Sequence, residues 1–211
     1  MMRWLLGCIV LLGTGCAVLP PVAEGEGRLP EQLAAFTLEG KVAWRHPEGR
    51  GNANLSWVQA EDDFRLLLTG PLGQGSVRLE SDGDGVRLDT PEGPRYAHQA
   101  DDLLADTLGF PVPIAQARWW VLGVAAPTAV AGSRAGGRAE VMERDVHGRP
   151  QVVRQDGWQI AWSDRRLVEG YALPRRVELS RAETRLTLVI GAWSLSGDRA
   201  RMASALPTPA N

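Results

Sequence analysis

Histidine is the residue type in this chain best suited to acid–base or metal chemistry, and its spacing argues against both. The three histidines, His46, His98 and His147, lie beside turn residues or at the end of a predicted strand. None has a cysteine or a second histidine at the spacing that metal ligands require. We therefore expect three ordinary surface histidines and no metal site.

Acidic residues cluster at Asp101, Asp102 and Asp106, on a stretch that we predict to be helical. Acids in the first turn of a helix complement its dipole, and this explains the cluster better than a pair of catalytic carboxylates does. The chain also lacks the nucleophile elbow, the zinc-protease helix, the Walker loop and the dinucleotide-binding fingerprint. The sequence thus predicts a protein that is not an enzyme and needs no cofactor.

Cysteine offers a different chemistry, because one of the two cysteines has the setting of a lipidation site. A basic residue, Arg3, precedes the apolar run 4–12, which suits the core of an export signal. Three small residues, 13–15, then stand directly before Cys16, as in the lipobox of bacterial lipoproteins. We expect residues 1–15 to be a signal peptide and Cys16 to be the acylated first residue of the mature chain.

Two other interpretations of the cysteines remain open. The usual leucine of the lipobox is replaced by Gly13, and the segment 5–8 ending in Cys8 matches the box better letter by letter. Cleavage before Cys8 would leave almost no apolar core for export, so we favour Cys16. Alternatively, both cysteines are plain apolar residues of a cleaved signal or an anchor. Ala17, in place of an aspartate, resembles the choice that directs lipoproteins to the outer membrane, at its periplasmic face.

Composition limits the remaining classes of function. The 211 residues carry a formal charge of −2, so no basic field is available to hold a nucleic acid. Glycine (24) and proline (14) are spread along the chain, which suits many short strands joined by turns. We expect a tether over 16–30, one monomeric domain over 31–195, and an unstructured tail over 196–211.

Apolar residues recur at every second position in ten or eleven short segments, which is the period of a β-strand. Clear examples are the segments 36–44, 64–68 and 186–190. Two stretches look helical, Gln99–Leu108 and Pro113–Leu122, and each is followed by a glycine that can end a helix. The sequence therefore predicts a mainly β fold, a curved antiparallel sheet with a small helical insert over its concave side.

Seven tryptophans follow Cys16, and they allow two interpretations. They can fill a solid core. However, a sheet of more than about eight strands that curls on itself encloses more space than its side chains fill, which leaves a cavity for a ligand. An apolar cavity in an exported, membrane-tethered protein points to lipid.

Several segments, taken in order, resemble one known family. They are Phe36–Ala43, Gly51–Gln59, Phe64–Gly73, Gly109–Pro113, Trp120–Gly123, Gln155–Trp158, Leu173–Pro174 and Leu186–Ile190. This order and spacing, behind a lipobox, is similar to that of the LolB family of outer-membrane lipoprotein receptors, over most of 36–193.

The resemblance implies an open, incomplete antiparallel β-barrel of about 11 strands with a helical lid over an apolar cavity. It also implies that the protein accepts acylated lipoproteins from the soluble periplasmic carrier LolA and places them in the outer membrane. The turn Pro71-Leu72-Gly73 matches a protruding loop that the family uses for delivery. The residues that we expect to line the cavity are Leu38, Val42, Leu55, Trp57, Leu66, Leu68, Val77, Leu79, Trp120, Trp158, Ile160, Leu188 and Ile190.

Two rival functions stay open on the sequence alone. One is a structural or scaffolding outer-membrane lipoprotein with a solid core, and the other is a carrier of a glycolipid or a free phospholipid. An open apolar cavity would separate both carriers from the scaffold.

Overall fold

The computed structural model describes residues 28–73, 75–82, 85–128 and 137–195. Cys16, the tether up to residue 27 and the tail from 196 onward lie outside these described residues. Within them, the chain forms eleven strands, two α-helices and two short 3-10 helices. The elements are η1 (Pro30–Gln32), β1 (Ala35–His46), β2 (Gly49–Ala60), β3 (Asp63–Thr69), η2 (Pro71–Gly73), β4 (Ser76–Asp82), β5 (Gly85–Thr90), β6 (Gly93–Ala97), α1 (Ala100–Leu108), α2 (Ile114–Val121), β7 (Glu140–Arg144), β8 (Pro150–Gln155), β9 (Trp158–Val168), β10 (Tyr171–Arg181) and β11 (Thr184–Ser194).

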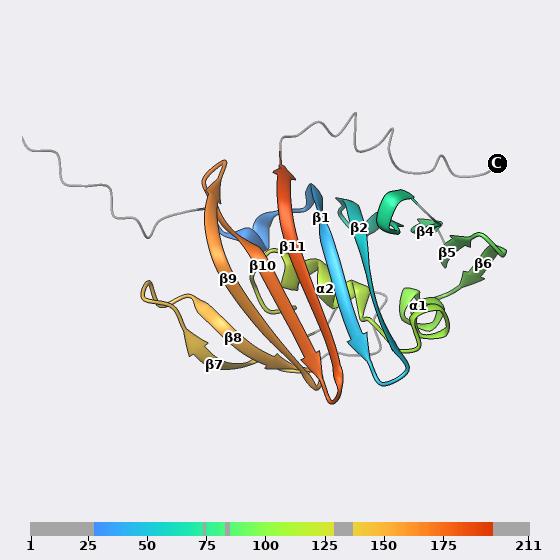
Figure 1. The fold of residues 1–211 in the computed structure, drawn as a ribbon. Coiled ribbons are helices and arrows are strands. Elements are labelled where there is room, and N and C mark those ends of the chain that lie inside the picture. The colour runs from blue at the N-terminus through green and yellow to red at the C-terminus, as the bar shows by residue number, and fades with distance from the viewer. Residues whose placement is uncertain (1–27, 74, 83–84, 129–136, 196–211) are drawn as a thin grey trace, which may run out of the picture.

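The described strands form one antiparallel sheet in the order β6-β5-β4-β3-β2-β1-β11-β10-β9-β8-β7. Every neighbouring pair is consecutive in the chain except β1 and β11, which meet at the centre. The sheet curves around α1 and α2 and leaves β6 and β7 as its two edges (Figure 1). The prediction of an open, mainly β fold with about 11 strands and a helical insert is confirmed.

Period-two alternation explains which face of the sheet is buried. On β2, for example, Leu55 and Trp57 are 6% and 2% exposed, whereas the intervening positions face outward. The register of β1 with β11 shifts once, between Glu39 and Gly40. Gly40 lies so close to β11 that a Cβ atom there would sit 2.5 Å from the carbonyl oxygen of Val189. A glycine at this position therefore permits the close approach of the two central strands.

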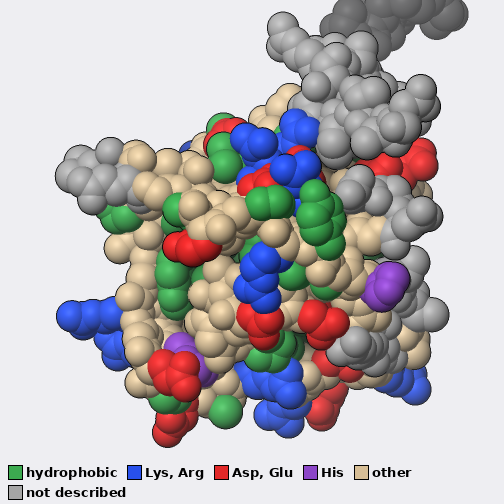
Figure 2. Space-filling view, turned by 90° about the vertical axis from the view of Figure 1, so that its right-hand side faces the viewer, with side chains coloured by type: hydrophobic (Ala, Val, Ile, Leu, Met, Phe, Trp, Pro, Cys, Tyr) green, Lys and Arg blue, Asp and Glu red, His purple; other side chains and the backbone are tan. Residues whose placement is uncertain are grey.

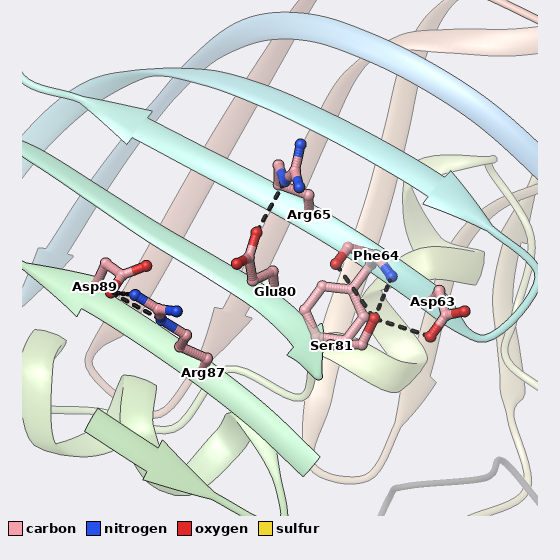
Figure 3. Close-up of polar contacts among 7 residues, drawn as sticks. All are labelled: Asp63, Phe64, Arg65, Glu80, Ser81, Arg87 and Asp89. Atoms are coloured by element: carbon pink, nitrogen blue, oxygen red, sulfur yellow. Dashed lines mark hydrogen bonds and ion pairs between the residues drawn. The ribbon is translucent and has the colours of Figure 1, made fainter. Parts of the chain in front are cut away.

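The outer face of β3, β4 and β5 carries ion pairs, one that joins β3 to β4 and one within β5 (Figure 3). The Arg65 guanidinium pairs with the Glu80 carboxylate at 2.9 Å, and Arg87 pairs with Asp89 at 2.8 Å. Ser81 Oγ accepts from the backbone N–H of Phe64 at 3.0 Å. The Arg65–Glu80 and Ser81–Phe64 contacts cross from β3 to β4 and favour the register that pairs Leu66 with Leu79 on the inner face. Seen from the side of α1 and β6, basic and acidic side chains are interspersed on the surface (Figure 2).

The two helices lie where the sequence predicts them, with small differences at their ends. Gln99 is the N-cap of α1 rather than its first residue, and Gly109 ends the helix in the left-handed conformation, with φ +81°. Pro113 is the N-cap of α2, and Leu122 follows the last residue as the C-cap. No helix in the described ranges is both long enough and apolar enough to cross a membrane.

The turn between β7 and β8 is held by one aspartate. Asp145 Oδ1 accepts from the backbone N–H groups of His147 and Arg149, each at 2.9 Å, and Oδ2 accepts from the Arg149 side chain at 2.8 Å. Burial raises the pKa of Asp145, but the hydrogen bonds from Arg149 and His147 outweigh it and leave this pKa below its usual value. Gly148 completes this turn in the left-handed conformation, at φ +78°.

Strand β6 (Gly93–Ala97) was not predicted, because its sequence lacks the alternation of apolar and polar residues that marks the other strands. Its residues are Gly, Pro, Arg, Tyr and Ala, and they have no period-two apolar pattern because the strand lies at an edge of the sheet. Tyr96 is 62% exposed. An edge strand pairs on one side only and tolerates a proline, so it need not carry the signature of a buried strand.

Candidate functional site

A cavity lies between the concave face of the sheet and the two helices, and every side chain that lines it is apolar. Its volume is about 100 Å³. The twenty lining residues are Val42, Trp44, Leu55, Trp57, Leu66, Leu68, Val77, Leu79, Leu104, Leu108, Phe110, Val112, Ile114, Ala117, Trp120, Val121, Val177, Leu179, Leu186 and Leu188.

Nine of the thirteen residues expected from the sequence meet at this cavity. They are Val42, Leu55, Trp57, Leu66, Leu68, Val77, Leu79, Trp120 and Leu188. The other four, Leu38, Trp158, Ile160 and Ile190, are at most 2% exposed and belong to the packed core instead. The reason is clearest at Trp158, whose ring centroid lies 6.4 Å from that of Trp120 in α2, so the sheet and the lid are in direct contact there.

Eleven lining residues were not singled out from the sequence. Seven of them belong to α1, α2 and the segment between the helices, and four are inward positions on β1, β10 and β11. The strand residues continue an alternation visible in the sequence, and the helical ones form the apolar faces of the two predicted helices. Both signals were therefore present, but only a structure shows which inward positions border empty space.

Two buried glutamines hold the polar edges of tryptophans away from the cavity. Trp57 Nε1 donates to Gln59 Oε1 at 3.0 Å, and Trp120 Nε1 donates to Gln155 Oε1 at 3.0 Å. Gln59 and Gln155 are 2% and 1% exposed. Because these indole N–H groups are satisfied inside the protein, the two rings offer only carbon to the cavity. Sequence reasoning missed both glutamines, although Gln59 continues the inward series of Leu55 and Trp57.

Buried hydrogen bonds fix the C-terminal end of α2 to the sheet. Gln155 Oε1 also accepts from the backbone N–H of Ala126 at 3.0 Å, and its Nε2 donates to the Ala126 carbonyl at 2.8 Å. Trp162 Nε1 donates to the carbonyl of Trp120 at 2.6 Å, and Arg165 donates to the carbonyl of Gly123 at 3.0 Å. Burial, aided by the charge of the nearby Arg149, lowers the pKa of Arg165.

Helix α1 is held mainly through apolar burial. Leu103 and Leu104 are 3% and 4% exposed, and Asp106 forms an ion pair with Arg95 of β6. Both partners of this pair face solvent, where such a pair contributes about 0–1 kcal/mol. Asp101 Oδ1 accepts from the backbone N–H of Ile114 at 3.2 Å, which links α1 to the start of α2. Burial of Leu103 and Leu104 and the Arg95–Asp106 pair therefore connect α1 to the sheet, and Asp101 connects it to α2.

The histidines do not form a site in the described structure. His46 is half-buried and packs on Phe110, with ring centroids 5.2 Å apart, at one end of the cavity, whereas His98 and His147 are exposed. His46 is therefore a packing residue rather than the surface histidine expected. Within the residues that the structure describes, no group of three or more His, Cys, Asp or Glu side chains could hold a metal ion.

The turn after β3 is a short 3-10 helix, Pro71–Gly73, closed by backbone hydrogen bonds. Gly70 N–H donates to the Gly75 carbonyl and Gly73 N–H donates to the Gly70 carbonyl, each at 3.1 Å. Pro71 and Gly73 are exposed. The side chain of Leu72 lies outside the described part of the structure, and so does Cys16.

Comparison with known proteins adds a family and a fold. The sequence model of a family described as "Outer membrane lipoprotein LolB" matches residues 34–193. A relative named "Outer-membrane lipoprotein LolB" from Alkalilimnicola ehrlichii is 34% identical over 198 residues, which is 90% of this chain and 95% of the relative. One of the same name from Chromohalobacter salexigens is 34% identical over 204 residues, covering 92% and 91%. Among solved structures, a DUF1329 family protein from Desulfovibrio piger superposes with a TM-score of 0.52 at 10% identity, covering 84% of this chain and 93% of that one.

Proposed function

The chain belongs to the family of outer membrane lipoprotein LolB, and on this premise we propose that it receives acylated lipoproteins from the periplasmic carrier LolA and inserts them into the outer membrane. Membership assigns it to the outer membrane as a lipid-anchored protein. Acylation at Cys16 is part of the proposal, as is the absence of enzymatic activity.

The observation that carries the proposal is the cavity whose twenty lining side chains are all apolar. Exposing an acyl chain to water costs about 0.8 kcal/mol per methylene, so a chain of roughly sixteen carbons faces a barrier near 13 kcal/mol. A cavity without hydrogen-bonding groups removes that cost and makes no demand on the protein attached to the lipid. Such a site suits many client lipoproteins, because it contacts only the part that they share.

The cavity must open before an acyl chain can enter it. Its lining comes from the sheet and from both helices, with Leu104 of α1 and Trp120 of α2 among the residues that cover it. The walls formed by the sheet are fixed by continuous strand pairing, so the change has to come from the lid. We infer that α1 moves away while α2 stays, because the end of α2 is held by buried hydrogen bonds from Gln155, Trp162 and Arg165.

This function requires no bond-making chemistry. Transfer can proceed toward increasing apolar affinity, from carrier to receptor to bilayer, and no nucleotide is consumed. For the final step, the resemblance to the family implies that the exposed turn Pro71-Leu72-Gly73 contacts the membrane, with Leu72 as its apolar residue. A Leu72→Glu variant is expected to accept the client but to deposit it poorly.

The test is a transfer assay with a form of the mature chain in which Cys16→Ala removes the anchor. This form is incubated with LolA loaded with a lipoprotein, and the client is followed by separating the two proteins. We expect the client to move to this chain, and to stay on LolA when Leu66→Glu places a charge in the cavity. Retention of the client by LolA in the presence of the unsubstituted cavity would refute the receptor function. Copurification of free phospholipid without any client uptake would favour the rival carrier.

A further inference from the structure

Three arginines form a row across the outer face of the central strands β2, β1 and β11, close to the β1–β2 and β10–β11 hairpins. In the register of the sheet, Arg45 of β1 lies opposite Arg50 of β2 on one side and opposite Arg185 of β11 on the other. All three residues are exposed. Like charges that lie directly opposite each other on neighbouring strands destabilise a sheet. This arginine row is therefore unfavourable for the fold by itself.

Other arginines on the outer face of the sheet have a carboxylate partner, and those of the arginine row do not. Arg65 of β3 pairs with Glu80 at 2.9 Å. Arg176 of β10 pairs with Glu178 at 2.6 Å. Within the described part of the chain, no carboxylate forms an ion pair with any arginine of the row, and none of their side chains makes a hydrogen bond. The fold thus leaves the positive charge of the row without a counterpart.

An open hollow lies beside the arginine row on the same face. The next outward positions on the three strands hold Asn52, Ala43 and Thr187, which lie opposite one another in the register. These three residues line the hollow together with the arginine row. A second hollow shares the same three residues and extends to Lys41 of β1, which is exposed. A floor of short side chains, with an amide and a hydroxyl among them, is thus bordered by cationic side chains on both sides.

The chemistry of this hollow matches a doubly charged anion. Its lining contains the three arginines and one carboxylate, that of Glu183 in the β10–β11 turn, so positive charge prevails there. A guanidinium presents paired N–H donors whose geometry fits the oxygens of a phosphate group, and asparagine and threonine side chains can donate to such oxygens as well. A phosphate group carries more charge and more acceptor oxygens than a carboxylate, and it can therefore contact several guanidinium groups at once.

We propose that Arg45, Arg50 and Arg185, with Asn52 and Thr187 beside them, form a binding site for a phosphate group, carried by a soluble compound or by a lipid headgroup. The bound anion offsets the repulsion within the arginine row. The site lies on the outer face of the sheet, whereas the apolar cavity lies on the inner face, so it does not depend on the receptor function proposed above.

The experiment titrates the mature chain with Cys16→Ala, as used in the transfer assay, with inorganic phosphate at constant ionic strength. Calorimetry measures binding, and the temperature of unfolding is recorded with and without phosphate. Arg45→Gln removes the charge at the centre of the row. Arg176→Gln is the matched control, because it removes the same charge from an exposed, paired position on the same face. Glu183→Gln removes the one carboxylate that lines the hollow.

We expect one phosphate to bind per chain, and Arg45→Gln to weaken this binding about tenfold, because it removes a charge-assisted contact. Arg176→Gln should leave the affinity unchanged, and Glu183→Gln should raise it. Phosphate should raise the temperature of unfolding of the unsubstituted chain and have little effect on that of Arg45→Gln. Without phosphate, Arg45→Gln should unfold at the same or a higher temperature than the unsubstituted chain, because it relieves repulsion between like charges.

Three results would overturn the proposal. The first is the absence of saturable phosphate binding. The second is equal weakening by Arg45→Gln and Arg176→Gln, which would indicate diffuse attraction rather than a site. The third is a lower temperature of unfolding for Arg45→Gln in phosphate-free buffer, which would give Arg45 a structural role.

A second arm identifies the source of the phosphate group. The same proteins are mixed with vesicles of phosphatidylcholine, with and without phosphatidic acid, whose headgroup is a phosphate monoester. Binding only to the vesicles with phosphatidic acid, lost in Arg45→Gln and displaced by inorganic phosphate, assigns the site to a lipid headgroup. Phosphate binding without vesicle binding assigns it to a soluble phosphate compound. Vesicle binding that Arg45→Gln and Arg176→Gln reduce equally counts against the site, as in the titration.

Discussion

Independent opening of α1 is the prediction that most directly tests how the cavity admits an acyl chain. Leu104, on α1, and Leu122, at the end of α2, are both buried, at 4% and 0% exposure, and only Leu104 lines the cavity. Replacing a buried leucine by alanine costs about 3 kcal/mol. Because each 1.4 kcal/mol is a factor of ten, an opening that exposes the substituted site becomes about a hundredfold more frequent.

Amide hydrogen exchange measures these openings segment by segment. Leu104→Ala is expected to speed exchange in α1 by about a hundredfold. Leu122→Ala, the matched control, is expected to speed exchange in α2 but to leave α1 unchanged, since Leu122 stays packed while α1 is open. Uptake of a fluorescent fatty acid should rise with Leu104→Ala and not with Leu122→Ala.

The reasoning is refuted if Leu122→Ala accelerates exchange in α1 as strongly as Leu104→Ala does. The two helices would then open as one unit, and the buried hydrogen bonds of Gln155 would not separate a fixed part of the lid from a moving part.

Three further predictions concern stability. Gln155→Ala removes the hydrogen bonds of buried groups on α2 and on the segment after it, and it should lower the free energy of unfolding by about 3 kcal/mol. Urea denaturation measures this change. An unchanged urea midpoint would contradict the role assigned to this side chain. Gly40→Ala pushes a methyl group against the carbonyl of Val189 and should cost about 2 kcal/mol in the same assay, whereas Gly191→Ala, with its nearest neighbour at 3.6 Å, should cost little. The lowered pKa of Asp145 stabilises the fold at neutral pH, and this contribution starts to be lost as the pH falls below about 4, so Asp145→Asn should destabilise the protein at pH 7 and progressively less as the pH is lowered further.

The strands and helices that bury one face could be predicted, because burial leaves a repeating pattern of apolar residues in the sequence. Alternation identified the strands that have one face in the core, and Gly109 marked the end of α1. Strand β6 escaped, because an edge strand with Pro94 has no buried face to display. The pairing of β1 with β11 has no local signature at all, and only the structure reveals it.

The candidate site was predictable to the extent that inward-facing residues are apolar. Whether an inward residue borders a cavity or packs solidly depends on the helices above it, and Trp158 shows this by packing against Trp120, with the two rings tilted to each other. Gln155 was missed because a polar residue at an inward position is hard to interpret until its partners are known. Its four partner atoms come from α2 and from the segments around Ala126 and Gly137, all distant in sequence.

The adjacency of β1 and β11 has a consequence for how the chain acquires its structure. Six strands precede the helices and five follow them, and only the pairing of the first with the last joins these two halves into one sheet. A chain emerging from the export channel can form each half as a meander of hairpins, but it cannot close the seam until residue 194 has crossed the membrane. Throughout translocation the apolar inner faces of both halves remain exposed to other molecules in the periplasm. A truncation that removes only β11 would therefore leave two separate half-sheets rather than one slightly smaller sheet.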